Sequence, residues 1–396
     1  MTDVDLSNPD SFEDGFPHDH FRKLRAEDPI HWHEGDVYGG TGYWVLSKYE
    51  DIKFVSKNPQ LFASGLGNLI EDPQPGELDV ARSMIVMDPP DHPRARKIVS
   101  QGFTPRQVAS QEPRVREIVR AILDNVASKG ECDFVTDVAA ELPLQVICEF
   151  LGVDQDDRQT VFDQSNRMLG SEDPEYGNSR AHSAVAAIEI FQFAYRLLQA
   201  RKAEPRDDLV TKLIEAELSD LEFGSFFLLL AVAGNETTRN LISHGMMLLI
   251  DHPAERDRLI RNPALIPSAV EEMLRMTAPV MYFRRTATAD TKIRDVDIRQ
   301  GEKVTLWYPS ANRDEAIFSD PDRFDVTRSP NEHLAFGVGQ HFCLGASLAR
   351  LEIRVMFEEL LKRLPDVELN GEVRKLRSHF IDGVKSMPVR FSPESP

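Results

Sequence analysis

The longest hydrophobic pattern in the chain predicts one long buried helix near its middle. Residues 219–222 form a capping box, an arrangement that begins many helices, and the helical pattern continues to about Asp251. Residues 226–233 are apolar on every side, which indicates burial. Gly234 interrupts this run well before the ~20 apolar residues that a transmembrane helix needs. We therefore expect a core helix rather than a membrane span.

Other stretches predict shorter helices around a smaller β region. Helical patterns cover residues 21–28, 49–58, two segments within 107–152, an interrupted stretch at 154–205, a helix opened by Pro267, and the residues after 343. Strands are expected at residues 30–32, 43–46, 281–287, within 293–308 and after 367. The interruption at 171–179 contains proline and glycine and predicts a loop. The fold class is therefore mainly α with a smaller β region.

Composition and charge add expectations about domain number, binding partners and cellular location. The 396 residues contain no long Ser/Gly/Pro linker and no repeat, and 41% are hydrophobic, so we expect one large domain over residues 1–396. The formal net charge of −19 argues against nucleic-acid binding, which needs a basic surface. The acidic N-terminus resembles neither a signal peptide nor a membrane anchor. Three cysteines without paired spacing suit a cytoplasmic protein, which we expect to be a monomer.

The first candidate for chemistry is the stretch FGVGQHFCLG at residues 336–345. A helical pattern begins directly after Cys343, so a thiolate there would lie near the positive end of a helix, which should lower its pKa. Gly337 and Gly345 let the backbone approach a bulky flat group. A buried structural cysteine is the simpler alternative. A zinc site with His341 is a weaker one, because Cys132 and Cys148 are far away in the sequence.

Two further motifs combine polar groups with helical patterns. The string AGNETT at residues 233–238 puts Glu236 and Thr237 into the buried helix, where carboxylates are rare unless they are paired or functional. A simple kink with a solvated polar face is the alternative. In residues 88–97, DPPDHPRARK, His92 and Arg96 are four apart and share one helix face. Taken alone, this pair would be a solvated first turn.

Together these motifs resemble the cytochrome P450 family over essentially the whole chain. The resemblance implies the P450 fold, with the long central helix over a heme b. In that family the residue at Cys343 is the iron ligand, and His92, Arg96 and Arg285 match positions that bind the heme propionates. Gly337, His341 and Gly345 belong to the same cofactor-binding motif. Gly234 would make room for O2, while Glu236 and Thr237 would deliver protons. Helices 154–205 would form a mobile lid.

A narrower resemblance concerns the substrate. Residues 234–245, YFRRTATADTKI and KVTLWYPSANRD are similar to bacterial P450s that hydroxylate methyl-branched lipids, sterol side chains or linalool. We therefore expect a monooxygenase, an oxidoreductase that hydroxylates a terminal methyl group of a terpenoid, lipid or steroid. Five residues are candidates for the substrate pocket, although ordinary core packing explains each of them equally well: Leu229, Val232, Met281, Phe283 and Ile381.

The resemblance also implies partners and competitors. The substrate is small and hydrophobic, O2 is the oxidant, and no reductase domain is fused, so a separate ferredoxin and its reductase should supply electrons. Arg94, Lys97, Arg114 and Arg116 are expected to form a basic patch for that donor. Arg323 should complete a structural pair with Glu272 and Arg275. A peroxygenase, a heme-thiolate isomerase or dehydratase, and a non-enzymatic heme gas or redox sensor remain as alternatives.

Overall fold

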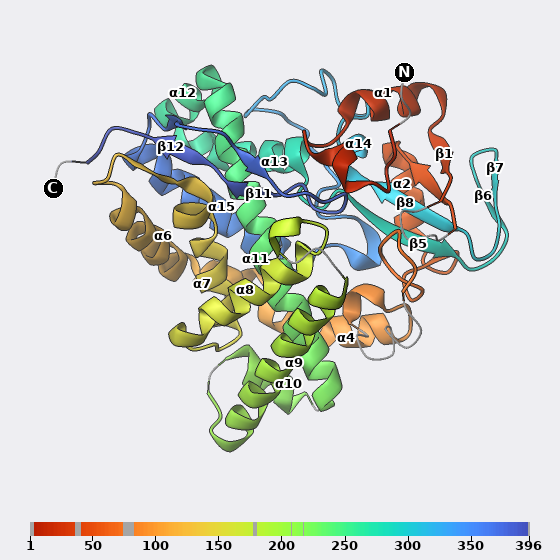
Figure 1. Ribbon diagram of the computed structural model, residues 1–396, viewed down its shortest axis with the longest axis horizontal. Coiled ribbons are helices and arrows are strands. Elements are labelled where there is room, and N and C mark those ends of the chain that lie inside the picture. The colour runs from red at the N-terminus through yellow and green to blue at the C-terminus, as the bar shows by residue number, and fades with distance from the viewer. Residues whose placement is uncertain are drawn as a thin grey trace.

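The fold is arranged around one 32-residue helix, α11 (Asp220–Asp251), which runs through the middle of the molecule (Figure 1). The structure is a computed structural model that describes residues 4–35, 41–73, 83–176, 180–206, 208–216 and 218–394. The predicted capping box is present: Ser219 Oγ accepts from the Glu222 N–H at 3.2 Å, and the Ser219 N–H donates to Glu222 Oε2 at 3.0 Å. The helix ends at His252, directly before Pro253.

Helices surround α11 and share its hydrophobic core. They are α1 (His18–Glu27), α2 (Tyr49–Lys57), α4 (Asp91–Ser100), α5 (Pro105–Ser110), α6 (Glu112–Val126), α7 (Glu141–Phe150), α8 (Arg158–Leu169), α9 (Arg180–Ala203), α10 (Leu209–Glu215), α12 (Pro253–Arg261), α13 (Ile266–Thr277), α14 (Tyr308–Ala311) and α15 (Ala346–Arg363). The largest cluster of buried apolar side chains extends from Met84 to Phe391 and includes both faces of α11. Burial on both faces is why this helix is apolar on every side.

A smaller β region lies at one side of the helices (Figure 1). Its main sheet has the order β1-β2-β8-β5-β3, formed by β1 (Ile30–His33), β2 (Tyr43–Leu46), β8 (Lys303–Trp307), β5 (Tyr282–Ala287) and β3 (Phe62–Ala63). Only β2 and β8 pair in parallel, with Val45 opposite Thr305. The remaining strands form short sheets: β4 (Glu131–Asp133), β12 (Pro388–Arg390) and β9 (Glu368–Leu369); β6 (Thr291–Ile293) and β7 (Val296–Ile298); β10 (Arg374–Lys375) and β11 (Val384–Ser386).

The observed elements agree with those predicted from the sequence pattern. The mainly α architecture and the long central helix are confirmed, and the interruption expected at 171–179 is a loop between α8 and α9, of which residues 177–179 lie outside the described part. None of the helices in the described ranges is long and apolar enough to cross a membrane. The first turns of α15, the middle of α11 and strand β5 converge on one internal cavity, which contains the candidate site.

Candidate active site

The loop of residues 336–345 is folded back on itself, which presents Cys343 to the cavity. The Cys343 N–H donates to the Phe336 carbonyl at 2.9 Å, and the Gly337 N–H donates to Leu334 at 2.8 Å. Gly337 has φ +67°, a conformation that a residue with a Cβ rarely adopts. Helix α15 begins at Ala346, and the backbone N–H groups of Gly345 and Ala346 hydrogen-bond to the Cys343 sulfur. The sulfur is therefore held at the start of a helix, as the motif predicted.

Two opposing effects act on the pKa of Cys343: burial raises it, and the N–H groups at the helix start lower it, as predicted. Burial raises the pKa of the Cys343 thiol, although the Gly345 N–H and the charge of Arg96 act in the opposite direction. Desolvation disfavours the thiolate more than these groups stabilise it. A metal ion bound to the sulfur would reverse this balance, because a coordinating thiol is deprotonated. The zinc alternative lacks support, since Cys343 belongs to no group of potential metal ligands within the described residues.

Four basic side chains gather at one edge of the same cavity. His92, Arg96, Arg285 and His341 all line it, and the rings of His92 and His341 lie 4.3 Å apart. Arg96 Nη2 donates to the Phe342 carbonyl at 2.6 Å, and Arg285 Nη1 donates only to its neighbour's carbonyl, that of Arg284, at 2.7 Å. His92 Nε2 is buried without a hydrogen-bond partner among the described residues. The cluster therefore offers donors for which the described residues supply no carboxylate at hydrogen-bond distance.

The pKa values of these four side chains are lowered by burial, because no carboxylate of the described residues bonds to them to offset it. Burial lowers the pKa of His92, of Arg96 and of Arg285, and burial together with the charge of Arg285 lowers the pKa of His341 to about 2. Desolvation destabilises each cation more than nearby groups such as Asp88, which favours the charged forms of His92 and Arg285, stabilise it. An anionic ligand with two carboxylates would supply the missing charge and accept the free N–H groups.

The cavity also has the shape of a site for a flat cofactor. It measures about 240 Å³ and is lined mainly by apolar side chains, many of them from α11 and the Cys343 loop, whereas α4 contributes the basic His92 and Arg96. A Cβ at Gly345 would meet no atom within 4 Å, and at Gly337 the nearest atom is Tyr308 Oη at 3.8 Å, so these glycines leave room beside Cys343. The thiol, the basic edge and the glycine-lined floor together fit heme b, with its iron at Cys343 and its propionates at the basic edge.

Helix α11 forms the wall of the cavity that contains Thr237. The Thr237 Oγ1 donates to the Ala233 carbonyl at 2.8 Å, one turn back along the helix. Gly234 also lines the cavity, but its missing Cβ faces α7, where an added carbon would lie 3.0 Å from Ile147 Cδ1. Gly234 therefore permits close packing of α11 on α7 in addition to opening space in the cavity.

Glu236 is buried but points away from the cavity. It forms an ion pair with Arg239, and Arg239 Nη1 donates to Asn166 Oδ1 of α8 at 2.7 Å. Burial raises the pKa of Glu236, and the charge of Arg239 opposes that rise. The structure thus brings Thr237 to the cavity wall and places Glu236 on the other side of the helix, facing α8.

Of the five pocket candidates, the cavity wall includes only Leu229 and Phe283. Val280 lines the cavity and pairs with Ile381, so the adjacent Met281 faces the opposite way and packs in a separate core cluster, because side chains alternate along an extended chain. Val232 likewise packs in the main core. Val232, Met281 and Ile381 do not line this cavity, so their part in the substrate pocket stays a prediction. Sequence analysis missed Met84, Ile85 and Phe103, which lie in segments without clear periodicity.

Glu272 and Arg275 form a buried ion pair, and the side chain that joins them is Arg328 rather than the expected Arg323. Arg275 Nε donates to Glu272 Oε2 at 2.8 Å, and both side chains are fully buried. Arg328 Nε donates to both Glu272 oxygens at 3.1 Å, whereas Arg323 is 63% exposed and lies 3.7 Å from Asp325. The prediction of the Arg323 side chain was wrong: this residue contributes only its carbonyl, which accepts from Arg275 at 3.2 Å, and within the described chain the guanidinium that bonds to Glu272 from this loop is that of Arg328.

Comparison with known proteins agrees with this geometry. The cytochrome P450 family model matches residues 11–380. A methyl-branched lipid omega-hydroxylase of Mycobacterium tuberculosis is 42% identical over 99% of this chain and 95% of its own. A steroid C26-monooxygenase of Rhodococcus jostii is 43% identical over 99% and 85%. A linalool 8-monooxygenase of Pseudomonas putida is 38% identical over the whole of both chains.

A solved structure extends the comparison to three dimensions. The Mycobacterium marinum cytochrome P450 in complex with pseudoionone has a TM-score of 0.93 to this chain and 38% identity, covering 99% of both chains. These matches, together with a cavity suited to heme, show that the chain belongs to the cytochrome P450 family, as a heme b monooxygenase that uses O2 and redox partners to oxidise a hydrophobic substrate.

Proposed function

We propose that this protein hydroxylates a terminal methyl group of a branched, apolar substrate, such as a methyl-branched lipid, a steroid side chain or a terpenoid. The relatives named for these activities are about 40% identical to it over nearly their full length. The observation that carries the proposal is the apolar cavity between Cys343 and α11, in which Leu229, Leu241 and Phe283 leave few polar groups to contact a substrate. Such a site binds hydrocarbon and orients it by shape.

The residues of the cavity divide into groups with separate tasks. Cys343 would ligate the heme iron, and His92, Arg96 and Arg285 would bind the propionates, with His341 beside them. When bound, heme supplies the activation of O2, and electron donation from a thiolate ligand favours O–O cleavage. The protein positions the substrate, excludes water and delivers protons.

Proton delivery is assigned to Thr237, with Glu236 behind it. Thr237 Oγ1 lies at the cavity wall, and its hydroxyl can rotate from the Ala233 carbonyl to a ligand in the cavity. Glu236 could take up protons from the α8 side of the helix, where its Oε1 is buried without a hydrogen-bond partner among the described residues. Its ion pair with Arg239 would have to open in each cycle.

Selectivity for a methyl end requires a narrow wall near the iron site. A primary C–H bond is stronger than a neighbouring tertiary or allylic bond, so a wide cavity would give internal products. Phe283 and Val280 on one side, with Leu229 on the other, are suited to hold the chain end-on. A misplacement of about 1 Å can cost on the order of a hundredfold in rate, so these side chains would decide which carbon reacts.

We propose a separate ferredoxin with its reductase as the electron source, and a cytoplasmic monomer of one domain. The single main core from Met84 to Phe391 supports one domain, and three free cysteines support a reducing compartment. The basic patch expected for the donor is not supported: Arg94 pairs with Glu222, Arg114 with Glu149, and Arg116 with Glu112, Glu358 and Glu359.

A spectrum and a product analysis test the proposal. The ferrous–CO complex of the wild type should show the strongly red-shifted band of heme-thiolate ligation, and the Cys343→Ser variant should lose it. With NADH and a surrogate reductase and ferredoxin, the wild type should oxidise linalool, a methyl-branched fatty acid or a sterol at a terminal methyl group. Predominant ring or mid-chain products would contradict the terminal-methyl assignment, and turnover supported only by H2O2 would favour a peroxygenase.

A further inference from the structure

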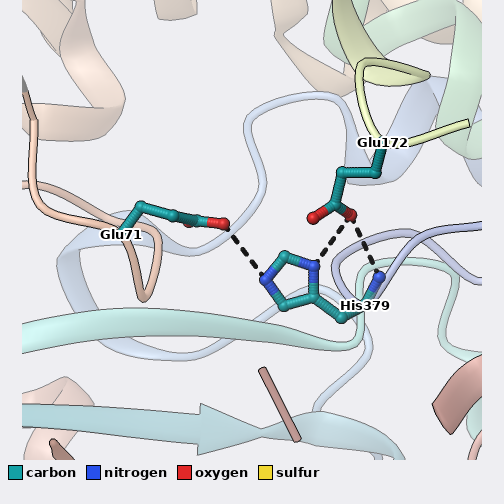
Figure 2. Close-up of side chains that lie close together, drawn as sticks. All are labelled: Glu71, Glu172 and His379. Carbon is teal, nitrogen blue, oxygen red and sulfur yellow. Dashed lines mark hydrogen bonds and ion pairs between the residues drawn. The ribbon is translucent and has the colours of Figure 1, made fainter. Parts of the chain in front are cut away.

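A buried cluster of three titratable side chains lies outside the heme cavity (Figure 2). The imidazole of His379 lies between two carboxylates: its Nδ1 is 2.8 Å from Glu172 Oε2, and its Nε2 is 3.2 Å from Glu71 Oε1. The side chains of His379, Glu71 and Glu172 are only 3%, 8% and 10% exposed. The backbone N–H of His379 also donates to Glu172 Oε2 at 3.3 Å. The function proposed above for the heme cavity involves none of these three side chains.

The three residues come from distant segments. Glu71 follows β3, Glu172 is in the loop between α8 and α9, and His379 is in the loop between β10 and β11. The last of these loops reaches the heme cavity, because the ring of Phe380 lies 5.7 Å from that of Phe283, which lines the cavity. The cluster therefore ties the α8–α9 helix pair and the segment at Glu71 to the wall of the cavity.

The charge state of His379 follows from its two neighbours. Burial on its own lowers the pKa of His379, but the hydrogen bonds and charges of Glu172 and Glu71 outweigh burial and raise the pKa to about 9. At neutral pH the ring is therefore an imidazolium that donates an N–H to each carboxylate. Charge-assisted hydrogen bonds of this kind are about twice as strong as neutral ones.

Other charged and titratable groups around His379 are already bonded elsewhere or reinforce the cluster. From β5, Tyr282 Oη lies 3.3 Å from His379 Nε2, and Arg284 donates to the Glu71 carbonyl at 3.2 Å. From the chain beside His379, Arg377 donates to Asp10 and to the Glu172 carbonyl, and Lys385 donates to Asp173. His379 is the cation that bonds to the Glu172 carboxylate in the described part of the chain.

A divalent metal is the other ligand chemistry that two carboxylates and an imidazole can support. The ligand atoms lie within 4.8 Å of one another. However, the two glutamates approach opposite nitrogens of the ring (Figure 2), so a metal on either nitrogen would meet only one of them without rearrangement. A metal-bound histidine also needs a free lone pair, whereas an imidazolium between two carboxylates has none.

The α8–α9 loop meets the C-terminal segment through further ion pairs. Asp173, which is 1% exposed, bonds to Lys385 at 2.7 Å and to the Arg377 N–H at 3.0 Å, and Glu175 pairs with Arg374. Lys and Arg keep their charge at pH 9, whereas His379 does not. His379 is therefore the cation of this group of ion pairs whose charge is lost as the pH rises through about 9.

We propose that His379 is an ionic latch: when protonated it holds the α8–α9 loop and the segment at Glu71 against the loop that borders the cavity, and loss of its proton releases them. Without that proton, the buried Glu172 carboxylate loses the charged side-chain donor that it has among the described residues, which is costly. The contribution is complete below pH 6.5, the ordinary pKa of the ring, and is lost as the pH rises through about 9. Opening of the helix pair beside the cavity thus becomes pH-dependent.

Hydrogen exchange of the heme-loaded protein tests the latch. Amide protection of residues 170–176, corrected for the intrinsic pH dependence of exchange, should fall between pH 7 and pH 9.5, by up to on the order of a hundredfold. Protection in α15 serves as the internal reference and should stay constant. The His379→Gln variant should already show the low protection at pH 7 and no further pH dependence.

Two controls separate the latch from its alternatives. The His252→Gln variant removes a histidine bonded to its own helix at Leu248 and should behave as the wild type. Constant protection of residues 170–176 in the wild type from pH 7 to 9.5 would overturn the proposal, and this result does not require any variant to fold. Stoichiometric binding of ZnCl2 that raises protection in the wild type, but not in His379→Gln, would also overturn it in favour of a metal site.

Discussion

At the scale of single residues, the site contains buried basic side chains that no carboxylate of the described residues bonds to. Arg285 and His92 are buried, and desolvation lowers the pKa of each, so their positions cost stability in the protein without its cofactor. A structure tolerates such groups where a ligand completes them. Burial of these basic side chains is what distinguishes a cofactor-binding site from a solvated basic turn at the start of a helix. The sequence motif around His92 does not show burial, so it could not decide between these two interpretations.

The predicted role of Thr237 can be tested by coupling. The Thr237→Ala variant should continue to consume NADH and O2, but product per NADH should fall by on the order of tenfold or more and released H2O2 should rise, because positioned proton donors contribute on the order of a hundredfold. The Thr237→Ser variant keeps the hydroxyl and is the matched control, so its coupling should stay close to that of the wild type. Equal coupling in both variants would exclude Thr237 from proton delivery.

At the scale of elements, sequence signals that span only a few residues predicted where the central helix begins and ends. The capping box at Ser219 and Pro253 after the helix set the bounds of α11, and both are properties of a few adjacent residues. Which side chain faces the cavity depends on the rotation of each element against its neighbours. Val232 and Met281 pack in buried clusters for that reason, although the elements around them could be predicted from the sequence.

The buried pair of Glu272 and Arg275 gives a prediction about stability at this scale. Burial alone raises the pKa of Glu272, but hydrogen bonds from Arg275, with Asp325 and Arg328, hold it below its ordinary value. Replacing Arg328, which is 10% exposed, by Ala should destabilise the fold by about 3 kcal/mol, because it weakens the pairing of a fully buried carboxylate. The Arg323→Ala variant should change the free energy of unfolding by less than about 0.5 kcal/mol.

Chemical denaturation of the two variants measures this difference. The benefit of Arg328 should be present above about pH 4.5 and should disappear on acidification, because a carboxylate with a lowered pKa loses its stabilising charge as it is protonated. Equal free energies of unfolding for Arg328→Ala and Arg323→Ala at pH 7 would show that Arg328 does not contribute to stability.

At the scale of the whole molecule, basic side chains of one helix pair with carboxylates of another helix that is distant in the sequence. Arg116 on α6 reaches Glu358 and Glu359 on α15, so a run of arginines that looked like a basic patch instead joins two helices. The sequence gives the sign of each charge but not the partner, because the carboxylates are more than 200 residues away. The net charge of −19 remains a property of the surface as a whole.

Some cations of the described chain lack such partners, and one of them, Lys97, belongs to the basic patch expected from the sequence. Lys57, Lys97 and Arg106 are exposed and, within the described chain, lie beyond 4.0 Å of any carboxylate. Lys57 ends α2, which packs on the turn at Gly339, and Lys97 follows Arg96, which bonds to the Phe342 carbonyl. Phe342 is 40% exposed beside Cys343. This face therefore offers a short path to the iron site and a local positive charge.

The Lys57→Glu/Lys97→Glu double variant should slow reduction by an acidic ferredoxin by on the order of tenfold at low salt and leave substrate binding unchanged. Opposite charges accelerate encounter, and salt screens them over about 10 Å at 0.1 M. The matched control is Lys292→Glu/Arg299→Glu, which changes the net charge equally at β6 and directly after β7, outside α2 and α4 (Figure 1). Stopped-flow reduction at several salt concentrations measures both. Equal slowing in the two double variants would attribute the effect to net charge, and a wild-type rate independent of salt would exclude electrostatic steering at this face.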